Sequence, residues 1–271
     1  MKKVKVLIKL AGEAVNLFFF NSKMLLMRMM QYRFNFMMGL LVAFGFSALG
    51  PLAQFLLYSN SNGYPGWNWD QMLLFQAVLL LVNGLTDILF GSVRRTIDNL
   101  MERGEFDRLL LKPYPPLMML LTSGFKPYGL GTVLVGIAGT VWAVVRIGVP
   151  AGGLGFFYFF IFLFARILLQ AGVHILYCFF TVRWIYPMRL DEITDKILAY
   201  GNYPMEIYPI VLRTLFTTAL PFAIACYWPA KALLGPVSWT AFTALGGTVL
   251  FVFAAVLLWR HQLKSYVSGG G

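Results

Sequence analysis

Several polar side chains that could do chemistry stand inside long apolar stretches of the sequence. Arg166 and Gln170 are four residues apart in one stretch, His174 and Cys178 have the same spacing further along it, and Asp87 lies near the end of another stretch. Residues at this spacing share one face of an α-helix. Ionisable residues within apolar helices are functional candidates, and the alternative for Arg166 is a structural arginine paired with a neighbouring helix.

A metal site finds little support in these residues. It would need more ligands than His174 and Cys178 supply, and the sequence contains neither an H-E-x-x-H nor a paired C-x-x-C motif. The second cysteine, Cys226, also has apolar neighbours, so no disulfide framework is expected. We therefore expect His174 to be packed in the interior or to form a hydrogen bond to a neighbouring helix.

Two enzyme motifs are incomplete or missing. Residues 45–48 read Gly-Phe-Ser-Ala and resemble the start of an intramembrane serine-protease motif, but the closing glycine is Ala48 and the only candidate base is His174. The sequence has no G-x-x-x-x-G-K-[ST] phosphate loop. If the chain is part of an ATP-driven machine, another polypeptide must bind the ATP.

The composition places the chain in a membrane. Of its 271 residues 59% are hydrophobic, and the mean hydropathy is +0.72, more apolar surface than a soluble domain carries. The long apolar runs favour helices, at about 20 residues per crossing, and lack the alternation of a membrane β-barrel. The net charge of +11 comes from basic residues at the ends of these runs, so it is not a nucleic-acid signal.

Hydropathy predicts five clear spans, which are residues 34–58, 71–93, 128–145, 156–180 and 238–259. In the third of them, Thr132, Gly136 and Thr140 form a face of small residues suited to close helix contact.

The chain is expected to be one transmembrane domain over residues 1–271. Residues 1–33 hold seven Lys/Arg and one acid and predict an amphipathic helix on the cytoplasmic face. Residues 59–70 lack Lys and Arg and carry aromatic residues, as outer loops do. Both termini are then cytoplasmic, including the tail 260–271. Between the terminal parts we expect spans one and two in 34–93, a cytoplasmic segment in 94–116, and spans three to six in 117–259.

Two topologies are open for residues 184–229. In the first, the charged residues 184–203 form a cytoplasmic loop, and residues 210–227 are the fifth span. In the second, residues 184–203 cross the membrane facing a polar interior, and residues 204–229 dip in and out of the outer leaflet. Charged residues can cross only where they face protein or water.

Residues 94–112 form the most charged segment of the chain, with five of the 22 Lys/Arg and four of the 11 Asp/Glu. Apolar residues at helical spacing on either side of Gly104 predict two short amphipathic helices. Arg94–Asp98, Arg103–Asp107 and Glu105–Arg108 are spaced to form ion pairs along a helix. Such a segment between spans can lie at the lipid headgroups or dock on a cytoplasmic partner.

Three patches in this order resemble a known family. The first is Tyr32-Arg33-Phe34 before the first span, and the second is GEFDRLLLKP at 104–113, which fits G-x-x-D-x-x-L-x-x-P. The third covers 203–235, with two Tyr-Pro pairs and further prolines. Together they are similar to permease subunits of ABC-type exporters of the type-2 class, in the subfamily described as ABC-2 family transporter protein. Residues 191–196 depart from the family by their high charge.

The resemblance implies an all-α fold with six membrane helices in a bacterial-type cytoplasmic membrane, and a non-catalytic chain. Such permeases work in pairs, often with a diverged second permease, on two ATP-binding subunits that hold the ATP and Mg²⁺. The segment after the second span is a coupling helix that docks on the ATPase. The stretch before the last helix forms a re-entrant outer gate, which favours the second topology.

The resemblance carries over to named residues. The expected coupling residues are Asp98, Glu102, Arg103, Glu105, Phe106, Asp107, Arg108 and Leu110, with Phe106 and Leu110 as packed anchors. The expected gate residues are Tyr203, Pro204, Tyr208, Pro209, Pro221 and Pro229. In a permease, the candidates for the substrate pathway are Asp87, Arg166, Gln170 and His174.

Two other classes of function compete with a transport subunit. An intramembrane or lipid-modifying enzyme would need a cluster of catalytic residues at one membrane depth, and the sequence has no convincing one. A membrane scaffold or immunity protein would have no need of the charged segment at 94–112.

Overall fold

The computed structural model describes residues 2–59, 64–148, 152–184 and 190–267. Parts of the predicted outer loop, of the 184–203 segment and of the C-terminal tail therefore lie outside the described residues. Within them the chain is helical, with no β-strand. Five helical stretches are long and apolar enough to cross a membrane, which confirms the five spans predicted from hydropathy. They are α2 (Arg33–Ser59), α3 (Trp69–Phe90) with its continuation α4, α7 (Gly129–Ile147), α8 (Gly152–Trp184) and α12 (Trp239–Lys264).

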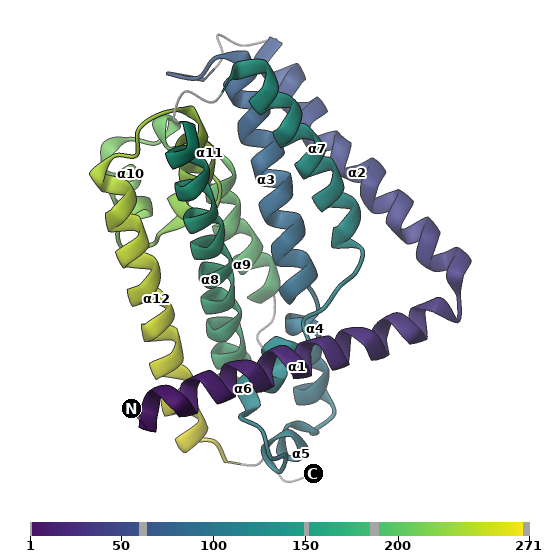
Figure 1. The fold of residues 1–271 in the computed structure, drawn as a ribbon. Coiled ribbons are helices and arrows are strands. Elements are labelled where there is room, and N and C mark those ends of the chain that lie inside the picture. The colour runs from purple at the N-terminus through teal and green to yellow at the C-terminus, as the bar shows by residue number, and fades with distance from the viewer. Residues whose placement is uncertain (1, 60–63, 149–151, 185–189, 268–271) are drawn as a thin grey trace.

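The N-terminal segment is a single helix of 29 residues, α1 (Lys2–Met30). It lies across the end of the bundle near α4 and α6, and a short turn leads from it into α2 (Figure 1). Asn21 Nδ2 donates to the carbonyl of Thr122 at 3.3 Å, and the rings of Phe18 and Phe125 meet edge to face at 5.9 Å. These contacts hold α1 against this end of the bundle.

Glycines bring α3 and α7 together. A Cβ on Gly84 would lie 2.7 Å from a side-chain carbon of Val133, and one on Gly136 would overlap the backbone of Leu81. The small face predicted on α7 therefore serves two neighbours, because Thr132 Oγ1 lies 2.8 Å from Ser47 Oγ on α2. Helices approach this closely only where side chains are small.

The charged segment folds into short helices at the same end as α1 (Figure 1). They are α4 (Val93–Glu102), α5 (Phe106–Leu110) and α6 (Pro116–Thr122). Between α4 and α5, Gly104 adopts a φ of +63°, a conformation that glycine takes without strain. The predicted pair of short helices is confirmed.

Residues 210–227 do not form one span, so the first of the two topologies is wrong. The stretch contains α10 (Ile210–Thr217), η3 (Phe222–Ile224) and the start of α11 (Tyr227–Leu234). Prolines divide it because they lack an N–H donor. The 8 residues of α10 span about 12 Å, far short of the roughly 30 Å of a bilayer core.

The described part of the preceding segment runs along the bundle instead. It comprises α9 (Leu190–Ala199), η1 (Tyr200–Asn202) and η2 (Met205–Ile207). Asp195 pairs with Arg94 beyond one end of α3, and Glu206 accepts a hydrogen bond from Trp67 before its other end. The 22 residues of α3 separate these ends by about 33 Å. This path agrees with the second topology, and Figure 1 shows α9 beside α8 below α10 and α11.

We expect Gly136→Ala to lower the stability of the chain in detergent by about 1–3 kcal/mol, because the new methyl group would push α7 away from α3. The measurement is the melting temperature of the purified chain. Gly45→Ala on α2 is the matched control, since nothing lies within 4 Å of its added Cβ, and its melting temperature should stay equal or rise. Equal effects of the two substitutions would contradict the assigned helix contact.

Candidate functional site

A polar cavity of about 500 Å³ lies among α3, α8 and α9. Asp87, Arg166, Gln170 and His174, the four residues predicted as pathway candidates, all line it. They come together because Asp87 lies on the turn of α3 that faces α8, and the other three are spaced four residues apart along one face of α8.

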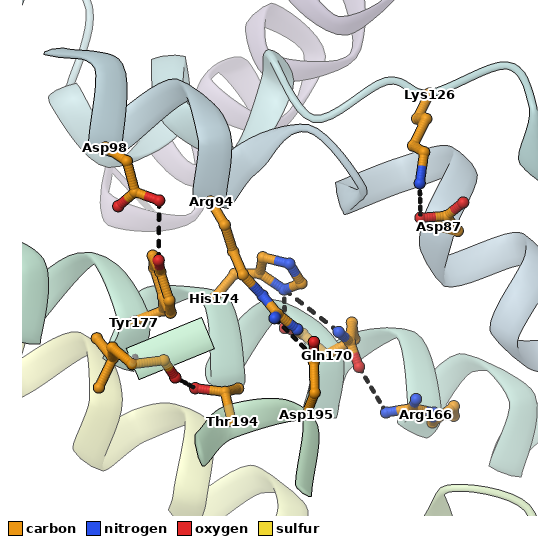
Figure 2. A network of polar contacts seen from close by, with 11 residues as sticks. Asp87, Arg94, Asp98, Lys126, Arg166, Gln170, His174, Tyr177, Thr194 and Asp195 are labelled. Carbon is orange, nitrogen blue, oxygen red and sulfur yellow. Dashed lines mark hydrogen bonds and ion pairs between the residues drawn. The ribbon is translucent and has the colours of Figure 1, made fainter. Parts of the chain in front are cut away.

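Gln170 links the three residues of α8 into one network (Figure 2). Arg166 Nη1 donates to Gln170 Oε1 at 2.7 Å, and the Nδ1 of His174 lies 2.8 Å from the backbone carbonyl of Gln170. A carbonyl oxygen only accepts, so Nδ1 carries the proton and donates it. His174 is thus packed, as one of the two predicted alternatives has it, with 3% of its surface exposed. Its hydrogen bond to Gln170 stays within α8 and does not reach a neighbouring helix.

Arg166 is buried, with 5% of its surface exposed. Its Nη2 reaches Asn83 Oδ1 at 3.5 Å, and its Nε has no hydrogen-bond partner among the described residues. Both side chains that it reaches are amides. The contact with Asn83 links Arg166 to the neighbouring helix α3, in agreement with the structural alternative offered by the sequence. This link is a long hydrogen bond and no ion pair, since the six ion pairs of the described residues leave Arg166 out.

Two ion pairs stand at the side of the cavity next to α4 and α6 (Figure 2). Lys126 Nζ lies 3.1 Å from Asp87 Oδ1, and Arg94 Nη1 lies 2.6 Å from Asp195 Oδ1. Asp195 is 65% exposed whereas Arg94 is 21% exposed, so solvent screens this second pair in part. The pair connects α4 to α9.

Asp98 is turned inward. It accepts a hydrogen bond from Tyr177 of α8 at 2.9 Å, and the guanidinium of Arg94 lies 5.6 Å from the centre of the Tyr177 ring. The i,i+4 ion pair predicted between Arg94 and Asp98 is therefore wrong, because both side chains find partners on other helices. These partners fasten α4 to α8.

The other predicted coupling residues divide between the interior and the surface. Phe106 is 1% exposed and packs edge to face on Trp259 and Tyr266 at 6.5 and 5.1 Å. It cannot anchor a partner as predicted, because its ring already holds α5 against α12. Leu109 is also buried. The next two residues face outward, and Leu111 is the more exposed of them at 86%, against 37% for Leu110.

Charges surround these leucines. Glu102, Arg103 and Arg108 are exposed, and the predicted pair of Glu105 with Arg108 is confirmed at 3.2 Å. Asp107 is engaged by its own chain, since burial and a hydrogen bond to Asp107 raise the pKa of the Tyr266 phenol. The surface left for a partner is thus smaller than predicted.

At the other end of the bundle, the predicted gate residues shape a series of turns. Pro204, Pro209 and Pro221 each stand directly before a short helix, and Pro229 lies buried in the first turn of α11. The hydroxyl of Tyr208 donates to the carbonyl of Tyr200 at 2.9 Å. Tyr203 follows η1 and is exposed.

Glu206 holds this end together, and the sequence analysis missed it. It accepts hydrogen bonds from Trp67 Nε1 at 3.0 Å and Tyr227 Oη at 2.7 Å, and Lys231 Nζ lies 3.4 Å away. Lys231 also sits 4.8 Å over the Trp67 ring. The signal in the sequence that could have identified Glu206 is its position as an acidic residue between the Tyr-Pro pairs at 203–204 and 208–209.

Hydrogen bonding decides the charge of Glu206. Burial alone would raise the pKa of its carboxyl, but the donors Trp67 and Tyr227 and the charge of Lys231 outweigh burial and hold the pKa below its ordinary value. The carboxylate therefore stays ionised at neutral pH.

The residues required by the competing enzyme hypothesis have separate partners. Ser47 Oγ donates to the carbonyl of Ala43 at 2.6 Å and lies beside Thr132, whereas His174 is bonded to Gln170. Within the described ranges, no three His, Cys, Asp or Glu side chains are grouped to hold a metal ion.

We expect Tyr177→Phe to lower stability by about 1.5–3 kcal/mol, because Asp98 would lose its hydrogen bond within a partly buried contact. The melting temperature of the purified chain measures the loss. Tyr158→Phe on the same helix is the control, since the Tyr158 hydroxyl makes no hydrogen bond to a described residue. If both variants melt alike, Tyr177 does not fasten α4.

We expect the contribution of Glu206 to stability to depend on pH. Because its folded pKa is lowered, the contribution is complete above the ordinary glutamate pKa of about 4.3 and is lost as the pH falls through the folded pKa. Melting temperatures between about pH 5 and about pH 3 should fall more steeply for the wild type than for Glu206→Gln. Glu192→Gln, at an exposed acid, should follow the wild type; a Glu206→Gln curve parallel to both would refute the assignment.

One comparison with known proteins identifies a relationship. A family model described as "ABC-2 family transporter protein" matches residues 44–270. The matched range includes the second and third of the patches noted in the sequence, whereas Tyr32–Phe34 lies before it. No curated protein and no solved structure matches the chain.

Proposed function

This chain belongs to the ABC-2 transporter family, and we propose that it is the permease subunit of an ATP-driven exporter. Membership makes it a multi-pass membrane permease of an ABC transporter, a family whose permeases are generally non-catalytic. The proposal adds the direction of transport, the place of docking and the route of coupling. One observation carries this proposal. Helix α4 belongs to the charged segment and contacts both α8 and α9, which form two walls of the polar cavity.

The coupling route follows the contacts of α4. Asp98 fastens the helix to α8 through Tyr177, and Arg94 reaches α9 through Asp195. A force on α5 is passed to α4 across Gly104 and from there to the cavity. Because Asp195 is largely exposed and α9 has no buried residue, α9 would part from α4 more easily than α8 would. A change of state requires such a difference in contacts.

The proposed docking surface is the solvent-exposed side of the charged segment at residues 94–112. Leu110 and Leu111 would fill a hollow on the ATP-binding subunit, and Glu102, Arg103 and Arg108 would surround them. The mixed charge of this surface suits a protein groove better than an anionic membrane. Phe106 supports the surface from beneath, so the anchor expected at Phe106 moves to Leu111.

The proposed topology has six crossings, with the segment 184–203, whose described part is formed mainly by α9 and η1, as a polar sixth beside the cavity. Both termini and α4–α6 then lie on the cytoplasmic side of a bacterial-type inner membrane, where α1 rests on the headgroups. The basic residues of the N-terminal segment favour this orientation. Residues 203–234 would close the outer end as a gate held by Glu206.

The proposed assembly contains two copies of an ATP-binding subunit and a second permease, more in keeping with a diverged paralogue than with an identical copy. ATP and Mg²⁺ would bind to the partner subunit, and this chain would need no cofactor and no nucleic acid. Helix α2, which exposes Met37, Leu41 and Phe44 among other large apolar side chains, would face lipid or the second permease.

A pull-down in mild detergent from native membranes tests the proposal. We expect an ATP-binding subunit to co-purify with the wild type and to be reduced at least about tenfold with Leu111→Asp, because a charge would replace the exposed anchor. Val267→Asp is the matched control, as Val267 is 83% exposed beyond α12 at the same end of the chain.

Each result has a distinct meaning. An ATP-binding subunit that is retained by Leu111→Asp would place the docking surface elsewhere on the chain. If no ATP-binding subunit co-purifies with the wild type, the exporter is contradicted, and the enzyme and scaffold alternatives must be considered again.

A further inference from the structure

The cavity among α3, α8 and α9 carries one positive charge that the protein itself does not neutralise. Its charged side chains form the pairs Lys126–Asp87 and Arg94–Asp195, which leaves Arg166. No described acid lies within 4.0 Å of its guanidinium, since none of the ion pairs of the described residues includes it. Arg166 stays protonated in proteins, so the site holds a net charge of about +1.

Hydrogen-bond donors are also in excess beside this charge. A guanidinium only donates, so the Gln170 oxygen must face Arg166 and its NH₂ group must face away. The nearest acceptor candidate for that NH₂ is His174 Nδ1 at 3.5 Å, but Nδ1 uses its own proton on the Gln170 carbonyl. The Arg166 Nε also lacks a partner among the described residues, although it is shielded from the cavity. The guanidinium and the Gln170 amide thus carry more donors than the described residues satisfy.

We propose that the cavity binds an anionic group, a carboxylate or phosphate, on Arg166 and Gln170. A buried cation without an ionic partner is costly, and an oxyanion would neutralise it while accepting from the part of the Arg166 guanidinium that lines the cavity and from the Gln170 amide. The planar guanidinium suits such two-oxygen contact. Asn83 and His174 border the site and limit where the group can sit.

The size of the cavity indicates that more than the anionic group enters. Its volume of about 500 Å³ falls within the roughly 300–1,000 Å³ typical of small-molecule sites. The assignment of the anionic group to the transported molecule rests on the proposed function, whereas the anion site itself does not. A substrate with an acidic head and a larger body would fit.

The test uses the full chain in a neutral detergent and measures its melting temperature. Sodium phosphate and sodium acetate are each compared with sodium chloride at equal ionic strength. We expect either anion to raise the melting temperature of the wild type, and the apparent affinity to fall about 10- to 100-fold in Arg166→Gln. Arg260→Gln, at an exposed arginine of α12, should respond as the wild type does.

Two further readouts separate binding from a structural role. Without added anion, Arg166→Gln should melt no lower than the wild type, because the substitution removes an unpaired buried charge. Gln170→Glu should melt higher and lose its response to phosphate, since it places a carboxylate where the Gln170 oxygen lies 2.7 Å from Arg166. This second variant keeps the test valid if Arg166→Gln fails to fold.

A second set of measurements, in lipid nanodiscs, identifies the source of the anion. The chain is also measured in phosphatidylcholine nanodiscs with and without phosphatidylglycerol. Stabilisation by phosphate or acetate that depends on Arg166 supports a site for a free or substrate-borne anion, and stabilisation by phosphatidylglycerol alone with the same dependence supports a lipid headgroup. The site is overturned if no anion stabilises the chain, or if the effect survives in both Arg166→Gln and Gln170→Glu.

These results are independent of the ATP-binding subunit. Binding of phosphate by a chain that captures no ATP-binding subunit would keep the anion site and refute the exporter. Capture of an ATP-binding subunit by a chain without an Arg166-dependent anion response would keep the exporter and refute the anion site.

Discussion

The cost of placing charged side chains within a lipid bilayer is the constraint on which this bundle depends. The described charges at mid-bundle turn towards one cavity, where Arg166 is held by amides and Asp87 by Lys126. The surfaces of α2 and α12 expose large apolar side chains instead. Of the four charged residues of α9, Asp195 lines this cavity and pairs with Arg94, whereas Asp191, Glu192 and Lys196 are exposed.

The helices on the two sides of the cavity differ in how closely they pack. Glycines let α3 and α7 approach until their backbones nearly touch, which makes them a rigid pair. In contrast, α9 has no buried residue, and the ion pair that joins it to α4 has an acid, Asp195, that is 65% exposed. The cavity thus has one tightly packed wall and one loosely packed wall, as a permease that alternates between two states would need.

The two ends of the bundle are closed by different means. At the end near α4, aromatic packing of Phe106 and the bond from Tyr177 to Asp98 hold short helices whose outer edge stays free. At the opposite end, prolines break the chain into short helices, and Glu206 gathers donors from Trp67 and Tyr227. The first arrangement suits the transmission of a force, and the second suits a closure that opens as a unit.

The sequence by itself determined the five apolar spans, the two short helices around Gly104 and the shared face of Arg166 and Gln170. Each of these depends on residues near one another in the chain, through hydrophobic runs and helical spacing. Only the tertiary structure decided the partners of Asp98 and Glu206, which lie 79 and 139 residues away. It also decided that Phe106 faces inward while Leu111 faces out, and that α9 follows the cavity. The physical reason is that Phe106, Leu109, Leu110 and Leu111 place apolar side chains on more than one side of this short segment, and the position of the neighbouring helices selects which of them are buried.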